Sequence, residues 1–323
     1  MLNDILRKQE NFINMATNLV KMGVVAGVAL TGIGLLMGDA DASVKLHQSY
    51  QTTTYLNSAG MPAKDVSQAM TIHGSDAYVA RKRSGKNQMY IEKVNLNNGS
   101  KRDLGNRDIG HGNGMTVVGN QLYVTRTGGS AVSGNNVNVY NITGNTIAYS
   151  HAYNVYDSKN RKVNISAMSW DSSHHRMIYA ANATLYVANS TKPNETHVTQ
   201  VAGHMTDQAR YGWAKTRSGV SQGILASGSK HNLYYTRSYN TTPGRGVNLG
   251  NKTYVGTVNL DKLVNNHKIV QGSEDAMGSY KSGNSIFEIE GLAQKDNRIY
   301  FNTTNMTNKS NRNTNTDFIA YFK

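Results

Sequence analysis

The chain of 323 residues contains no cysteine, three prolines and two tryptophans. Without cysteine there is no disulfide, no thiolate metal site and no thiol nucleophile. With so few prolines, the turns must depend on Gly and Asn. Charged residues make up 17% of the chain and hydrophobic residues 38%. Because the apolar residues stand in short, regularly spaced strands, this composition predicts a folded β protein and not a disordered one.

Only one long uncharged run occurs, the 16 residues Met22–Met37. Basic residues up to Lys21 precede it, and the small-x-small sequence Ala40-Asp41-Ala42 follows. This order is typical of an export signal, so residues 1–42 are predicted to be removed and the secreted chain to begin at Ser43. The alternative is a retained membrane anchor, but a membrane span needs about 20 apolar residues.

The net charge is +14, and residues 43–323 alone carry +15, from 31 basic and 16 acidic side chains. Such an excess favours polyanionic partners. For an exported or cell-surface protein these are anionic cell-wall polymers, lipid headgroups or acidic glycans, and not nucleic acid. The alternative is that the charge only keeps a secreted protein soluble.

A short pattern recurs five times: a polar residue, a tiny residue and a bulky apolar residue open a strand, and a Tyr-containing strand follows. The openings are Gln68-Ala69-Met70, Asn113-Gly114-Met115, Ser166-Ala167-Met168, Gln222-Gly223-Ile224 and Glu290-Gly291-Leu292. The tyrosines are Tyr78, Tyr123, Tyr179, Tyr234 and Tyr300. A repeat of this length in units made only of strands predicts a β-propeller. The tyrosines are expected to pack between blades and not to form sugar platforms.

The predicted fold class is all-β, a five-bladed propeller of four-stranded blades formed by one domain, residues 43–323. The blades are expected near 62–104, 110–157, 161–207, 216–275 and from 285 onward. The last blade reaches the end of the chain after three strands. Lys45–Thr53 alternates apolar and polar residues, so this N-terminal strand is predicted to complete the last blade and close the ring. The role of a long insertion, Tyr239–Asn251, stays open.

The polar residues of the five openings are expected to line one mouth of the axial channel. They are Gln68, Asn113, Ser166, Gln222 and Glu290. Three arginines end the second strands on the same side: Arg81, Arg126 and Arg237. Guanidinium groups bind phosphate and carboxylate oxygens in pairs, so these eight residues form the predicted ligand-binding site. The alternative is that the arginines pair with backbone carbonyls or with carboxylates of the protein itself.

Two histidine positions are candidates for a functional role. His111 lies in the glycine-rich loop Gly110–Gly114 and joins the predicted ligand-binding site, since such a loop offers backbone N–H groups to an anion. A tight turn with an exposed histidine is the alternative. The adjacent pair His174-His175 has no carboxylate at metal-ligand spacing beside it, so no metal and no cofactor is predicted.

Catalysis is the second class of function. Some five-bladed propellers hydrolyse glycosides, which requires two carboxylates roughly 5–10 Å apart. Glu290 at the channel mouth is one candidate, and Asp65, just before the first blade, is the other. A lectin-like module that binds surface glycans is a third possibility, and it would tolerate salt.

The last blade also carries a family resemblance, in Phe287–Ala293 followed by Arg298–Phe301. Weaker similarity lies in Ser166–Asp171 and Val220–Gly223. These segments, and the basic, cysteine-free character of residues 60–323, resemble the helveticin-like large bacteriocins of lactobacilli. The resemblance implies an antibacterial protein that acts on Gram-positive cells, with no enzymatic site.

Overall fold

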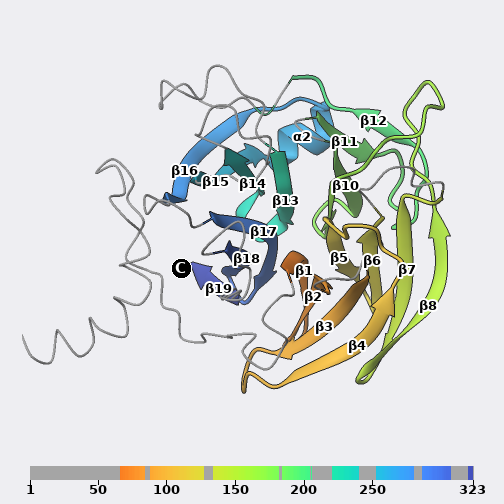
Figure 1. Cartoon of the computed structure of the whole chain (residues 1–323). Helices are drawn as coiled ribbons and strands as arrows, with labels where there is room; N and C mark the ends of the chain where they lie inside the picture. The colour runs from red at the N-terminus through yellow and green to blue at the C-terminus, as the bar shows by residue number, and fades with distance from the viewer. Residues whose placement is uncertain are drawn as a thin grey trace, which may run out of the picture.

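The computed structural model describes residues 66–83, 88–126, 134–181, 184–203, 205, 220–239, 252–279, 286–306 and 319–322. They form five antiparallel sheets arranged around an axis, so the fold is an all-β propeller (Figure 1). The predicted signal 1–42, the predicted closing strand 45–53, Asp65 and residues 240–251 lie outside the described residues.

Each sheet takes strands that are consecutive in the chain. The first contains β1 (Val66–His73), β2 (Asp76–Lys82), β3 (Met89–Asn95) and β4 (Lys101–Arg107). The second contains β5 (Met115–Val118), β6 (Gln121–Thr125), β7 (Val137–Thr143) and β8 (Thr146–Tyr153). The third contains β9 (Ala167–Asp171), β10 (Arg176–Ala181), β11 (Thr184–Ala188) and β12 (Val198–Gln200). The fourth contains β13 (Val220–Ser227), β14 (Asn232–Tyr239), β15 (Lys252–Asn259) and β16 (Gln271–Ser279). The last contains β17 (Ile286–Lys295), β18 (Arg298–Met306) and β19 (Ile319–Phe322).

The prediction of five four-stranded blades is confirmed only in part. Four sheets are complete four-stranded blades, and the last sheet has three strands among the described residues. In that sheet β19 pairs with β18 and stands at the outer edge.

The innermost strands β1, β5, β9, β13 and β17 lie next to one another in this order, and β17 lies beside β1 (Figure 1). The tiny residues of the repeat explain how they fit. A Cβ atom on Gly114 would lie 2.8 Å from the Ala167 Cα, and one on Gly291 would lie 2.4 Å from the Met70 nitrogen. Real Cβ atoms do not approach backbone this closely, so the ring requires glycine at these two positions.

The apolar core is divided among the interfaces between neighbouring sheets. Each of five buried clusters joins residues of two adjacent sheets, including one that joins the last sheet to the first. The prediction that the repeated tyrosines pack in this core is confirmed for four of them, and the fifth is half-buried. The buried four are Tyr78, Tyr123, Tyr179 and Tyr300, and the fifth is Tyr234.

The sequence analysis did not predict helix α2 (Leu260–Asn266), which joins β15 to β16. Its seven residues are too few for a visible helical period. The Asn259 side chain accepts a hydrogen bond from the Lys262 N–H and so caps the first turn. Leu260, Leu263 and Val264 pack into the core. Within the described ranges, no helix has the length and apolar character needed to cross a membrane.

Candidate functional site

The predicted mouth residues do gather in space. Gln68 and Gln222 lie at the third positions of β1 and β13, and Asn113 and Ser166 lie just before β5 and β9. Glu290 is the fifth of the ten residues of β17. Since these strands are neighbours around the ring, their starts meet at one end of the axis. The structure therefore brings these five backbone positions together, while Arg81 and Arg126 pair with carboxylates of the protein itself.

Arg81 is not available to a ligand. Its side chain is buried in the first sheet, where it lies 3.5 Å from the Glu92 carboxylate. It also donates to the Tyr90 hydroxyl at 3.0 Å and to the Ser67 hydroxyl at 3.1 Å. The prediction that Arg81 binds an external anion was wrong, because register pairs it with Ser67 inside the sheet and the carboxylate comes from strand β3.

Arg126 is half-buried and already holds an anion of the protein. It donates through Nε and Nη2 to the two carboxylate oxygens of Asp108, at 3.3 and 2.6 Å. This two-point contact is the one predicted for a ligand, but its partner is internal. The backbones of Gln222 and Arg237 belong to β13 and β14, and their side chains lie outside the described residues.

Two of the other mouth residues use their side-chain donors in hydrogen bonds within the protein. The Gln68 side chain donates to the Ser67 carbonyl at 2.8 Å, and the Ser166 hydroxyl donates to the Ala180 carbonyl at 3.1 Å. His111 is exposed in its loop, and its pKa is lowered by partial burial and by the nearby charge of Lys82. Asn113 presents a buried amide oxygen without a hydrogen-bond partner among the described residues.

Glu290 is buried at the mouth, where it is the extra residue of a bulge in β17 between Ile289 and Gly291. Its predicted catalytic partner Asp65 lies outside the described residues, so no carboxylate separation is available to predict a hydrolytic mechanism. The described side chains of the mouth thus include one buried carboxylate, on Glu290, and the amides of Gln68 and Asn113.

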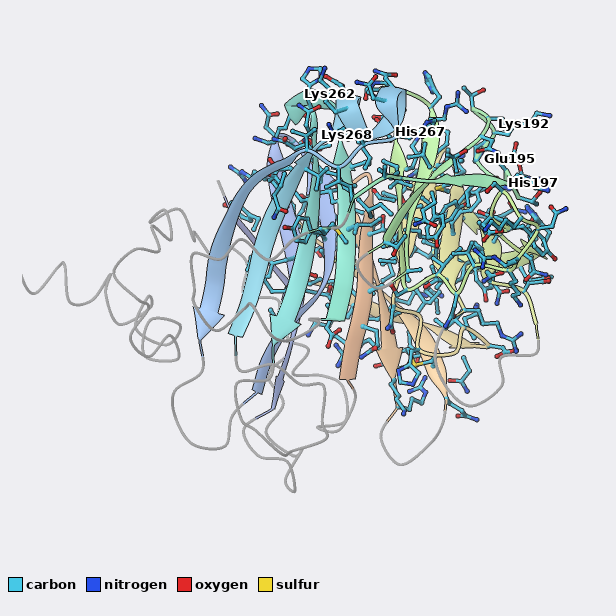
Figure 2. The ribbon with its side chains drawn as sticks, turned by 90° about the horizontal axis from the view of Figure 1, so that it is seen from above. Lys192, Glu195, His197, Lys262, His267 and Lys268 are labelled. Atoms are coloured by element: carbon cyan, nitrogen blue, oxygen red, sulfur yellow. The ribbon has the colours of Figure 1, made fainter. Side chains whose placement is uncertain are left out.

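A second set of polar residues lies at the opposite end of the strands. We call it the turn surface and define it as Lys230, Lys262, Lys268, His174, His175, His231 and His267. Figure 2 shows Lys262, His267 and Lys268 at this end, with Lys192, Glu195 and His197 on the flank beside them. All three lysines are exposed, and none forms an ion pair with a described carboxylate.

Short connections hold these side chains together. His174 and His175 come from the turn between β9 and β10, and Lys230 and His231 from the turn between β13 and β14, where η2 (Gly228–Lys230) lies. The Leu260 N–H donates to the His231 carbonyl at 2.9 Å, which ties the second turn to α2. The turn surface thus spans the third and fourth sheets.

Histidines and carboxylates form a chain across the turn surface. The His174 Nδ1 lies 2.6 Å from Asp171, whose side chain is buried, and its Nε2 lies 3.4 Å from Asp261. On the other side of Asp261, the His231 Nδ1 lies 3.3 Å from the carboxylate. The Asp171 carboxylate also accepts from the Ser173 N–H at 2.9 Å. No group of three described side chains is placed to hold a metal ion.

The turn surface was not predicted from the sequence, because its residues are far apart in the chain. A signal was present: connections between the first and second strands, and between the third and fourth, all lie at one end of a propeller blade. Sorting charges by connection would have grouped Lys230, His231, Lys262 and Lys268.

Comparison with known proteins adds only a general likeness. Neither a protein-family model nor a curated protein matches the chain. Among solved structures, a GH43 protein of the Bacteroides ovatus xyloglucan locus is 9% identical with a TM-score of 0.49, and covers 81% of this chain and 53% of its own. The GH43 BlXynB protein of Bacillus licheniformis is 10% identical with a TM-score of 0.45, over 80% of this chain and 53% of its own. TolB from Acinetobacter baumannii is 9% identical with a TM-score of 0.37, and the match covers 80% of this chain and 54% of TolB. The chain thus spans about half the length of each of these proteins, and at such low similarity none informs its activity.

Proposed function

We propose that the chain is an exported cationic propeller that binds the anionic polymers of Gram-positive cell envelopes and acts as an antibacterial protein. The observation that carries the proposal is the turn surface, where Lys230, Lys262 and Lys268 stand exposed without carboxylate partners. The arginines at the channel mouth do not contribute, since Arg81 and Arg126 are neutralised by carboxylates of the protein.

Lysine suits this kind of partner. An ammonium group is a compact point charge with three donors and no required orientation, so it accepts phosphates from a flexible polymer in many poses. A site of this kind gains affinity from several weak contacts and loses it as salt screens the charges. The net charge of +15 on residues 43–323 adds a long-range attraction to the same partners.

The resemblance to helveticin-like bacteriocins supports the antibacterial part of the proposal, and the predicted export signal supports the location outside the cell. Lipid headgroups and acidic surface glycans carry the same chemistry as wall polymers. A test must therefore compare binding to cell walls with binding to these two other kinds of ligand.

We also propose that Lys45–Thr53 completes the last sheet. The outer edge of β19 has no described neighbour, whereas the other four sheets have four strands each. Ile319 and Tyr321 on β19 are buried, so this strand is held in the core. Its outer edge can then pair with a further strand. A five-bladed ring closed in this way would have no open seam.

A glycosidase is the alternative function. Its support is the buried Glu290 at the mouth, whose partner carboxylate has not been placed. Replacing Glu290 by Gln would abolish sugar release by such an enzyme, and would leave binding to cell walls intact.

The test uses the secreted chain, residues 43–323, and isolated Gram-positive cell walls. We expect it to sediment with the walls at low ionic strength, to be released by salt, and to lose most of its binding to walls stripped of teichoic acid. In parallel, the protein is spotted on lawns of lactobacilli. Binding that withstands high salt and persists on stripped walls would contradict the proposal.

A further inference from the structure

The turn surface contains more histidines than lysines, and this has a consequence for its charge. We propose that mild acid strengthens polyanion binding by the turn surface, because protonated histidines convert it from nearly neutral to strongly cationic. The inference rests on the proposed function and adds the condition under which the surface binds best.

The charges of the turn surface nearly cancel when its histidines are neutral. The three lysines and the two carboxylates of Asp171 and Asp261 together carry a net charge of +1. Four imidazolium groups would raise the charge to +5. Histidine is the side chain that ordinarily changes its charge between about pH 5 and 8. No other described site combines so many histidines with unpaired lysines.

The two carboxylates face the histidines directly. In its cationic form His174 donates through Nδ1 to Asp171, and its Nε2 lies 3.4 Å from the Asp261 carboxylate. Cationic His231 faces the same Asp261 carboxylate from the other side. Protonation therefore neutralises the carboxylates that otherwise oppose Lys230 and Lys262. From the last sheet, the neighbouring turn adds Lys295 and Asp296, which pair with each other.

Backbone conformation favours a role for the imidazoles themselves. His175, His231 and His267 all have positive φ, at 52, 51 and 48°. In the left-handed region Gly and Asn are the residues of lowest cost, and His231 and His267 are the C-caps of η2 and α2, where glycine is usual. Gly or Asn would adopt these left-handed turn conformations at a lower energetic cost than His. Backbone geometry alone therefore does not explain why histidine occupies these three positions.

The same feature supplies a matched variant. Asparagine tolerates the left-handed conformation and does not titrate, so the triple variant His175→Asn, His231→Asn and His267→Asn should fold as well as the parent. His174→Gln removes the fourth imidazole and keeps a hydrogen-bonding side chain. The melting temperature of each variant is measured first, and a variant within a few degrees of the parent is used.

The experiment measures affinity for inorganic polyphosphate of fixed length at pH 7.5 and pH 5.5, at several salt concentrations. For the parent we expect at least a tenfold gain in affinity at pH 5.5. We also expect a steeper salt dependence, by about 0.7 in log–log slope for each added charge. The asparagine triple variant should gain less than threefold. A dextran sulfate, whose sulfate esters stay ionised throughout, shows that the change lies in the protein.

Each outcome decides between the two proposals. If the parent binds equally well at both pH values, or if the asparagine variant gains as much as the parent, acid gating by the turn surface is wrong and the proposed function still stands. If the parent binds neither probe at either pH, the proposed function itself has failed, and the gating fails with it. A gain confined to the parent supports both.

Discussion

The guanidinium of Arg81 lies 3.5 Å from the carboxylate of Glu92 in the interior of the first sheet, with both side chains almost fully buried. Such a pair is costly to break, because the remaining charge is left without compensation in a poorly solvated site. Arg81 is thus a structural residue, although its place in the sequence repeat made it a candidate for binding.

Replacement of Arg81 by Met should lower the free energy of unfolding by about 3–5 kcal/mol, since the buried Glu92 carboxylate would lose the guanidinium beside it. The double variant Arg81→Met, Glu92→Leu should recover a large part of the loss. Urea unfolding of the three proteins measures both effects. A loss below about 1 kcal/mol in the single variant would show that solvent reaches the pair.

Substitution of Gly291 by Ala should destabilise the junction between the last and first sheets. The new Cβ would lie 2.4 Å from the Met70 nitrogen and 2.7 Å from the Asn302 Oδ1, and only movement of an innermost strand would relieve the overlap. We expect a loss of about 1–3 kcal/mol.

Gly74→Asn is the matched control for Gly291→Ala. Gly74 has a φ of 60° in the turn between β1 and β2, and a Cβ there would meet nothing within 4 Å. Asn accepts this conformation, so the control should change stability by less than about 0.5 kcal/mol. Equal effects of the two substitutions would mean that β17 and β1 do not approach as described.

Tyr78 should make the protein sensitive to alkali. Burial, with a smaller contribution from Asp76, raises the pKa of Tyr78 to about 12. A folded-state pKa above the ordinary value near 10 means that its stabilising contribution is complete below pH 10 and is lost as the pH rises toward 12. Tyr78→Phe should flatten the fall in stability over this window, and Tyr149→Phe, at an exposed tyrosine, should not. Denaturant midpoints at pH 9, 10 and 11 make the comparison.

Lys82 should control the titration of His111. Burial is the main reason that the pKa of His111 is lowered, and the Lys82 charge lowers it further. In Lys82→Met we expect the pKa to rise toward the ordinary value and to stop short of it, since burial remains. A proton NMR titration of the His111 ring follows this directly. An unchanged value would place Lys82 too far away to act.

The fold was more predictable from the sequence than the site. The strands that contain Tyr78 and Tyr123 followed from the five-fold repeat, and the tiny residue of that repeat is Gly291 where β17 approaches β1. These features are local or periodic. The partner of Arg81 was not predictable, because Glu92 comes from β3 and only the register of the sheet shows that the two meet.

The turn surface could not be predicted from the sequence for the same reason. Asp171, His174 and Asp261 belong to connections of two different sheets, and no spacing in the chain reveals that His174 reaches both carboxylates. Conversely, the sequence repeat correctly placed Arg81, Arg126 and Arg237 near the ends of the second strands of their sheets. It carried no information on ion pairs within the protein. Contacts between residues that are far apart in the chain can be identified only in the folded structure.

The central claim is that the turn surface carries the binding of anionic polymers. Its most direct test is the salt dependence of polyphosphate affinity at pH 5.5 for the triple variant Lys230→Gln, Lys262→Gln and Lys268→Gln. The control, Lys82→Gln, Lys101→Gln and Arg102→Gln, removes equal charge from the first sheet, which does not adjoin the fourth. We predict that the log–log slope falls by about 2 in the turn-surface variant, and by less than about 0.5 in the control. Equal slopes in the two variants would contradict the account.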